Sequence, residues 1–367
     1  MTSPPVIRVA CSPGEARVAV TREEVLLEFA LWRPAAPDGT DEIHLGRVTA
    51  RRPELGGAFV TLAGHEPGFL PDQEGKTALQ EGAVVTVRIV RPALGGKGPR
   101  LKPAEHPADT SQAPRLLVPA PSPVERLAAR YPDSPILIDN PGFAARLPSA
   151  LNRRIQIVTS AFTEQTADAA EALTRPEVLL PGGMTATITP TPALVAVDMD
   201  SGTALGGRDS KQRAQYAANL HALPDLLAQI RLRELSGAIL IDPAGLAVRK
   251  RLALREPVEA LLKNDPAGPR LLGVSALGFL EVVRPRRRAP LHELLDSPHG
   301  RALDALRCAV RQHRPGDSRE LRCGTALFRA LGNDPEALRE AVSGCDGRLR
   351  MRVDLSLNLS AWELHDA

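Results

Sequence analysis

Leu194-Val-Ala-Val-Asp198-Met-Asp200-Ser-Gly and Gly237-Ala-Ile-Leu-Ile-Asp242-Pro are the two runs that decide the fold of this chain. Each is an apolar segment that ends in a carboxylate, and an amphipathic stretch joins them. This order is the pattern of a strand, a crossover helix and a second strand. Because neighbouring strands lie about 4.8 Å apart, we expect Asp198 and Asp242 to converge, and they could then hold a divalent cation.

The stretch between the two runs predicts one long helix over residues 209–235. Its apolar side chains recur every three or four residues and form a stripe for the sheet: Leu220, Leu223, Leu227 and Ile230. Pro224 should kink or divide this helix, since proline has no amide hydrogen to donate. Further strands are predicted at 270–274 and 279–283, so alternating strands and helices favour a mixed α/β sheet with covered faces.

The amino-terminal part is rich in short strands. Residues 7–32 alternate apolar and polar side chains and predict two or three strands. From residue 42 to 102, turn residues separate further short strands at the spacing of a small barrel. Residues 103–122 are rich in Pro, Ala and Ser and predict a linker or a loop over the surface. The apolar run Ile136-Leu-Ile-Asp139 predicts a buried strand, which we expect to complete the sheet begun before the barrel.

Two aromatic residues stand out in the barrel, because the chain has only seven Phe, two Trp and two Tyr. Phe59 and Phe69 lie on adjacent predicted strands, where each could stack on a base and contribute about 1–3 kcal/mol. Lys97, Arg100 and Lys102 could contact phosphates. The alternative is that both rings fill the barrel core.

The composition limits the size, the class and the partners that the protein can have. The chain has 367 residues, 43% of them hydrophobic, which is enough for two or three compact units. The net charge is only +3, but 40 of the 46 basic residues are arginine, a residue suited to phosphate, so nucleic acid is a possible partner. Without an apolar run of about 20 residues or an apolar leader, we expect a cytoplasmic protein that does not bind membranes. The four cysteines form no CxxC pair, and we expect them to be reduced and mostly buried.

These segments resemble the bacterial RNase E/G ribonucleases. Gly46-Arg-Val-Thr, Gly57-Ala-Phe59-Val and Pro67-Gly-Phe69-Leu-Pro are similar to the OB-fold RNA-binding domain that interrupts an RNase H-like domain in that family. The run 195–201 is similar to its metal-binding strand, Ala218-Asn219-Leu220 to its helix signature, and Ile239-Leu-Ile-Asp242 to its second metal strand.

The resemblance implies a multidomain, mixed α/β protein in five parts. In chain order these are the first part of the RNase H-like domain (1–41), the OB-fold RNA-binding β-barrel (42–103), a linker with the second part of the RNase H-like domain (104–184), an α/β metal-binding catalytic module (185–290) and a small C-terminal domain (291–367).

The chemistry that the resemblance implies is Mg²⁺-dependent cleavage of single-stranded RNA, in RNA processing or decay, leaving 5′-phosphate and 3′-hydroxyl ends. Asp198 and Asp242 would hold a single Mg²⁺, a cation that prefers oxygen ligands. Asp200 shares a strand face with Asp198 and can approach the same ion. Such an ion activates water and polarises the scissile phosphate.

Four positions depart from the family pattern: Asp200 replaces an Asn, His221 a Glu, Gly245 the second acid after the second strand, and Ala276 the Arg of an Arg-Phe-Gly run. Arg284 and Arg286 could substitute for that arginine and contact RNA, or could form a solvated basic patch. The alternative function is therefore a catalytically degenerate RNA-binding protein of the same fold.

Two further expectations concern partners. The Cys-Pro-x-Cys motif of zinc-linked family dimers is missing from Leu291-His-Glu-Leu-Leu-Asp-Ser-Pro-His-Gly300, so we expect no zinc-linked dimer, and an oligomer would use other surfaces. A third hypothesis, an ATP-dependent phosphotransferase, depends on the phosphate-loop-like turn Asp198-Met-Asp-Ser-Gly-Thr203, but no second Gly-rich phosphate loop follows it.

Overall fold

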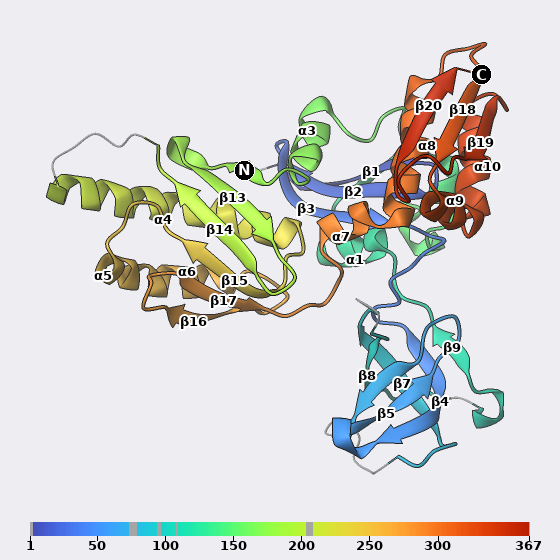
Figure 1. Ribbon diagram of the computed structural model, residues 1–367, viewed down its shortest axis with the longest axis horizontal. Coiled ribbons are helices and arrows are strands. Elements are labelled where there is room, and N and C mark those ends of the chain that lie inside the picture. Colours follow the sequence, from blue (N-terminus) through green and yellow to red (C-terminus); the bar gives the residue numbers. More distant parts are fainter. Residues whose placement is uncertain (1–2, 73–78, 94–96, 108, 203–207, 367) are drawn as a thin grey trace. The chain divides into compact units, whose positions relative to one another are not determined.

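A computed structural model describes residues 3–72, 79–93, 97–107, 109–202 and 208–366 (Figure 1). The chain divides into two compact units, one formed by residues 1–167 with 292–367 and the other by residues 168–291. The fold is mixed α/β, as predicted. None of the helices in the described parts of the chain is long and apolar enough to cross a membrane.

The unit 168–291 is built on a six-stranded sheet. Its strands, in spatial order, are β12 (Glu177–Leu179), β13 (Thr185–Pro190), β14 (Val195–Asp200), β15 (Gly237–Asp242), β17 (Leu280–Arg284) and β16 (Arg270–Val274). β14 and β15 pair in parallel, as the strand–helix–strand pattern predicts, and the other pairs are antiparallel.

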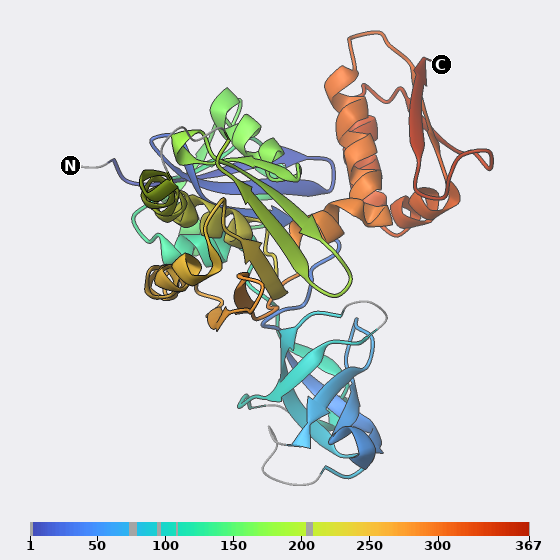
Figure 2. The same cartoon turned by 60° about the vertical axis from the view of Figure 1, so that its left-hand side comes forward.

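Helices α4 (Arg208–Leu232) and α6 (Arg255–Leu262) pack on this sheet, and the short α5 (Val248–Arg251), which buries none of its residues, lies between β15 and α6 in the chain (Figures 1 and 2). Of the two effects predicted for Pro224, a division of α4 is excluded, because the helix is continuous there. The predicted stripe is wrong at Leu220, which is 37% exposed. Leu223 and Ile230 are buried as predicted, and Leu226 is buried with them, because the contacts of the folded sheet select the helix face.

The prediction of covered sheet faces is wrong at β14. Val195, Val197 and Met199 are buried, whereas the alternate residues Ala196, Asp198 and Asp200 are exposed. A strand that alternates in this way packs one face against the helices and leaves the other accessible. The two acids of β14 therefore stand on an accessible face.

The second unit contains a five-stranded sheet whose strands come from either side of the barrel. Its order is β11 (Ile155–Ile157), β10 (Ile136–Ile138), β1 (Val6–Ser12), β2 (Glu15–Arg22) and β3 (Val25–Trp32). β10 pairs in parallel with β1, so the sheet begun before the barrel is completed after it, as predicted. Helices α1 (Pro123–Arg130), α2 (Pro141–Ala144) and α3 (Glu164–Ala172) belong to the chain after the barrel. That this sheet is RNase H-like stays a prediction, as do the five domain boundaries.

The barrel closes through five strands: β4 (Ile43–Arg52), β5 (Gly57–Thr61), β6 (Gly68–Pro71), β8 (Arg100–Pro103) and β7 (Val84–Arg91), with β7 and β5 both pairing to β4. This closed arrangement is OB-like, as predicted. A further strand, β9 (Arg115–Val118), adds to β4, so the predicted linker 103–122 is partly a strand. Its backbone groups bond to β4, a long-range pairing that composition does not reveal.

The C-terminal residues form a small α/β part with its own core. It contains α7 (Leu291–Asp296), α8 (Pro298–Gln312), α9 (Thr325–Gly332), α10 (Pro335–Gly344) and a three-stranded sheet ordered β19 (Leu349–Val353), β18 (Arg319–Cys323) and β20 (Trp362–Asp366). All four cysteines are free thiols, two of them buried and two half-buried.

Candidate functional site

The register of β14 and β15 brings two strand-end acids together. Asp198 pairs directly with Asp242 across the parallel strands. Residues in register on neighbouring parallel strands point to the same face, and their strands lie about 4.8 Å apart. Asp198 is exposed and the Asp242 side chain is 37% exposed. Two accessible carboxylates side by side offer the oxygen ligands that Mg²⁺ prefers, so the residues present fit such an ion.

Asp200 lies two residues further along β14, on the same exposed face as Asp198. Its backbone pairs with Thr185 of β13, not with β15. One carboxylate oxygen, Oδ1, accepts a hydrogen bond of 2.9 Å from the amide of Gly202. Asp200 therefore shapes the turn after the strand and stands beside the pair of acids rather than in register with it.

The turn itself bears on the phosphotransferase hypothesis. That hypothesis depends on Thr203, which lies outside the described residues, as does the rest of the segment 203–207.

Arg251 is a site residue that the sequence analysis missed. Its Nη1 donates hydrogen bonds to Oδ1 of Asp242 at 2.6 Å and to the carbonyl of Gly278 at 3.1 Å, while its Nε donates to the carbonyl of Leu246 at 2.8 Å. These contacts aim a guanidinium at one of the two acids. The signal in the sequence is the basic run Arg249-Lys-Arg251, which ends nine residues after Asp242.

Amide side chains of α4 hold the loop that follows Asp242. Asn219 is fully buried and bonds to both backbone groups of Ala244, accepting from its amide at 2.9 Å and donating to its carbonyl at 3.0 Å. Gln212 likewise donates to the carbonyl of Gly245 at 2.9 Å and accepts from the amide of Ala247 at 3.1 Å. Asn219, in the helix signature, therefore positions the backbone beside Asp242.

The structure shows the surroundings of three positions that depart from the family pattern. Gly245 has φ of +61°, and a Cβ atom there would lie 2.0 Å from Nε2 of Gln215. His221 is exposed on α4, and Ala276 is exposed in the turn before β17. A side chain at 245 would therefore have to displace the end of the Gln215 side chain, and Ala276 brings no charge to its turn.

Arg284 does not lie where RNA could reach it beside the acids. Its side chain is 3% exposed and bonds to Asp265 at 2.7 Å and to Glu234 at 2.9 Å. Burial lowers the pKa of this guanidinium, but the hydrogen bonds and charges of Asp265 and Glu234 outweigh burial and raise it.

The position of Arg284 in the sheet also argues against its predicted role, which was to contact RNA beside the two acids. Arg284 pairs with Gly237 at the start of β15, five residues from Asp242, and a strand rises about 3.3 Å per residue. Arg284 is therefore a buried structural cation at the far end of the strand from the acids. Arg286 is half-buried, and its contact with RNA stays a prediction.

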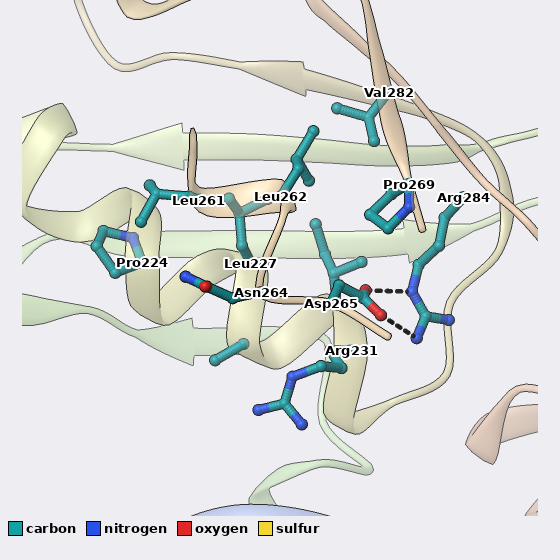
Figure 3. A pocket seen from close by; sticks show the side chains of 12 residues that line it. Pro224, Leu227, Arg231, Leu261, Leu262, Asn264, Asp265, Pro269, Val282 and Arg284 are labelled. Atoms are coloured by element: carbon teal, nitrogen blue, oxygen red, sulfur yellow. Dashed lines mark hydrogen bonds and ion pairs between the residues drawn. The ribbon is translucent and has the colours of Figure 1, made fainter. Parts of the chain in front are cut away.

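A cavity of about 140 Å³ lies at this far end, between α4, α6 and β17 (Figure 3). Leu227, Leu262 and Val282 line it with apolar surface, and the Arg284–Asp265 ion pair forms part of its wall. It is therefore separate from the Asp198–Asp242 pair.

The two barrel phenylalanines form a pair on the outer face. Phe59 and Phe69 are in register across β5 and β6, and their ring centroids lie 5.5 Å apart. Their strand neighbours Ala58, Val60 and Leu70 are buried, whereas both rings are half-exposed. The alternative that both rings fill the core is therefore wrong.

Basic residues lie on and just before β8, the strand next to Phe69. Arg100 of β8 is in register with Phe69, and Lys102 lies on the same side of β8 because the intervening Leu101 is buried. Lys97, Arg100 and Lys102 are all exposed. We define these three basic residues together with Phe59 and Phe69 as the barrel face.

Comparison with known proteins agrees with the sequence pattern. Residues 142–287 match the model of the Ribonuclease E/G family. Ribonuclease E of Synechocystis sp. is 33% identical over 129 residues, which are 35% of this chain and 19% of that protein. Ribonuclease E of Escherichia coli is 32% identical over 171 residues, 43% of this chain and 16% of that protein. The matches thus cover less than a fifth of either relative.

Proposed function

We propose, from the premise that this chain belongs to the Ribonuclease E/G family, that it is an endoribonuclease that cleaves single-stranded RNA with the help of Mg²⁺. The observation that carries the proposal is the in-register pair Asp198 and Asp242, which lies within the family match on an accessible sheet face.

In this proposal each residue of the site has a defined task. Asp198 and Asp242 hold the cation, which when bound supplies an activated water and a polarised phosphate. Arg251 orients the Asp242 carboxylate, and its positive charge attracts the RNA phosphate to the same edge of the sheet. Asn219 fixes the loop behind Asp242 through Ala244, so that the carboxylate keeps its position.

The barrel face would bind the RNA chain. Phe59 and Phe69 present half-exposed rings on which bases can stack, and Lys97, Arg100 and Lys102 supply charge for phosphates. We propose that the barrel is an OB-fold domain inserted in an RNase H-like domain. Cleavage would leave 5′-phosphate and 3′-hydroxyl ends. The proposal also includes a role in RNA processing or decay and a cytoplasmic location.

The test is cleavage of a labelled, A/U-rich single-stranded RNA by the full chain, with Mg²⁺ or with EDTA. We expect cleavage only with Mg²⁺, and products whose 5′-phosphates allow ligation. Asp242→Asn should reduce the rate at least about 100-fold, because the ion loses one of its two carboxylate ligands. Asp225→Asn is the matched control, since Asp225 is an exposed aspartate of α4, and should leave the rate unchanged.

A second candidate function is RNA binding without cleavage. It is favoured by Gly245 and Ala276, which leave two positions of the family pattern without a functional side chain. Tight RNA binding with no Mg²⁺-dependent product would support it and reject the endoribonuclease.

A further inference from the structure

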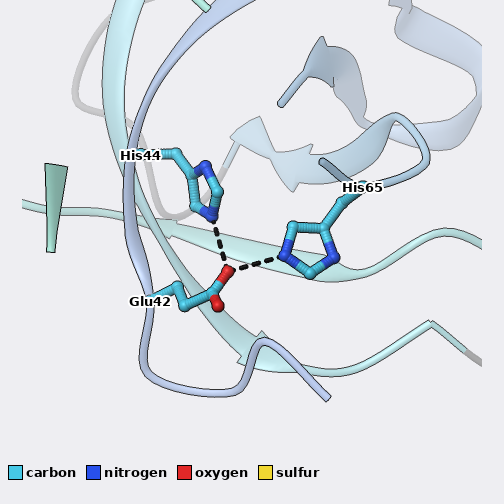
Figure 4. Close-up of side chains that lie close together, drawn as sticks. All are labelled: Glu42, His44 and His65. Carbon is cyan, nitrogen blue, oxygen red and sulfur yellow. Dashed lines mark hydrogen bonds and ion pairs between the residues drawn. The ribbon is translucent and has the colours of Figure 1, made fainter. Parts of the chain in front are cut away.

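Three side chains of the barrel converge at a place that the proposed function does not use. Oε2 of Glu42 lies 2.9 Å from Nε2 of His44 and 2.6 Å from Nε2 of His65 (Figure 4). One potential ligand atom from each residue lies within 4.8 Å of the other two. Glu42 and His44 flank the start of β4, and His65 comes from the loop between β5 and β6.

The cluster is buried on one side and open on the other. The side chains of His44 and Glu42 are 0% and 6% exposed, whereas that of His65 is 21% exposed. Burial alone would raise the pKa of Glu42, but the hydrogen bonds from both imidazoles lower it to about 2, so the carboxylate stays ionised. An ionised carboxylate inside a fold requires compensating positive charge or donors.

We propose that Glu42, His44 and His65 form a binding site for one Zn²⁺-class cation per chain, inside a single barrel. Two imidazoles and a carboxylate are ligands that Zn²⁺ accepts, whereas Mg²⁺ prefers oxygen ligands alone. The exposed side of His65 gives the ion an entrance and leaves a fourth position for water.

The spacing suits a tetrahedral ion after a small adjustment. With bonds of about 2.0–2.1 Å, neighbouring ligand atoms of such an ion lie roughly 3.3 Å apart. The two oxygen–nitrogen distances of 2.9 and 2.6 Å are about 0.4 and 0.7 Å short of that. His65 lies in a loop, so its side chain can make most of this movement, whereas His44 is fixed by burial.

Binding also requires the imidazole protons to move. In the metal-free cluster both Nε2 atoms face the same carboxylate oxygen, so each carries a hydrogen. A doubly protonated His65 would release its Nε2 proton to solvent. His44 would transfer its hydrogen to Nδ1, a buried atom with no hydrogen-bond partner among the described residues. The buried donor left there weakens the site without blocking it, since metal ligation is the stronger interaction.

The test uses the full chain prepared without a histidine tag and stripped with EDTA. Calorimetric titration with Zn²⁺ should show a site that binds one ion per chain, and Co²⁺ should give the visible absorption of a tetrahedral complex. His65→Ala removes the most exposed ligand and should weaken this binding at least tenfold and abolish the Co²⁺ spectrum. His106→Ala is the matched control, because His106 is a half-buried histidine of the segment after β8 and lies outside the cluster.

Absence of stoichiometric Zn²⁺ binding to the wild-type chain would overturn the proposal, and so would binding that His65→Ala leaves unchanged. A circular dichroism spectrum shared by variant and wild type ensures that lost binding does not reflect an unfolded barrel. Cleavage of RNA with Mg²⁺ is measured separately, so failure of the zinc site and failure of the endoribonuclease are distinguishable.

Discussion

Gly245 shows how a single residue adapts the site to its surroundings. The loop after Asp242 turns through a positive φ at Gly245 and passes directly against Gln215 of α4. Only glycine combines that backbone conformation with that close approach. The loss of an acid here is therefore coupled to the local packing of the loop.

We predict that Gly245→Ala lowers the free energy of unfolding by about 1–3 kcal/mol, from backbone strain and the contact with Gln215. Urea denaturation of the variant and the wild type measures this difference in the free energy of unfolding. The control is Gly182→Ala, because Gly182 has φ of +73° but nothing within 4 Å of an added Cβ atom. Equal losses in the two variants would show that the contact with Gln215 has no effect.

For single residues, the sequence predicted the positions of the two acids but not those of the two arginines. Asp198 and Asp242 could be predicted to lie together because strand pairing follows from the apolar pattern. Arg284 and Arg251 could not be placed, since a charge pattern does not reveal its partners. Arg284 bonds to residues 19 and 50 positions away, and Arg251 reaches Asp242 only through the turn of α5.

Among the elements, strand alternation in the barrel separates core from surface. β5 buries Ala58 and Val60 and turns Phe59 outward, and β6 buries Leu70 and turns Phe69 outward. Removing an outward ring should therefore change binding more than stability.

We predict that Phe59→Ala and Phe69→Ala each weaken binding of single-stranded RNA by about 1–3 kcal/mol, with little change in unfolding. Fluorescence anisotropy with a labelled RNA measures the affinity. Phe328→Ala, which removes a 38% exposed ring from α9, is the control and should bind RNA as the wild type does. Loss of affinity in all three variants would argue against a specific stacking role for the barrel face.

The contact between β4 and the β5–β6 loop should depend on pH in the metal-free protein. The pKa of Glu42 is lowered from 4.5 to about 2, so its contribution to stability is present above pH 4.5 and is lost as the pH falls towards 2. The pKa of His65 is raised above 6.5, chiefly by its hydrogen bond to Glu42, so its contribution is present below pH 6.5 and is lost as the pH rises through the raised value.

We therefore predict that the stability difference between the wild type and His65→Gln is greatest between pH 4.5 and 6.5. There it should be about 2 kcal/mol, the size of a hydrogen bond to a charged group. Urea titrations in EDTA across this range measure it, with His106→Gln as the control. A stability difference between the wild type and His65→Gln that does not vary with pH would contradict an ion pair between Glu42 and His65.

Across the whole molecule, the alternation of apolar runs predicted the mixed α/β class and the closed barrel. It did not predict the strand β9 or the undivided helix α4. β9 forms because β4 offers it backbone partners, and α4 stays continuous through Pro224 because its buried face packs on the sheet. Both outcomes depend on long-range packing that overrides local preference.

The net charge of +3 does not indicate where RNA would bind, but salt dependence can. For single strands, each phosphate neutralised changes the slope of log affinity against log salt by about 0.7. We predict that Lys97→Ala with Arg100→Ala reduces that slope by about 1.4. Lys263→Ala with Arg270→Ala removes the same charge from exposed positions of the other unit and should leave the slope unchanged.

The interrupted sheet has a consequence for how the chain is made. Synthesis delivers β1, β2 and β3 before the barrel, and β10, the partner of β1, only after it. Until then β1 has an unpaired edge, the kind of edge that recruits other chains. The barrel can close on the ribosome during this interval, and its closure shortens the chain that must loop back to deliver β10. A ribosome that stalled between the barrel and the codon of Ile136 would leave a finished barrel joined to an open, aggregation-prone sheet.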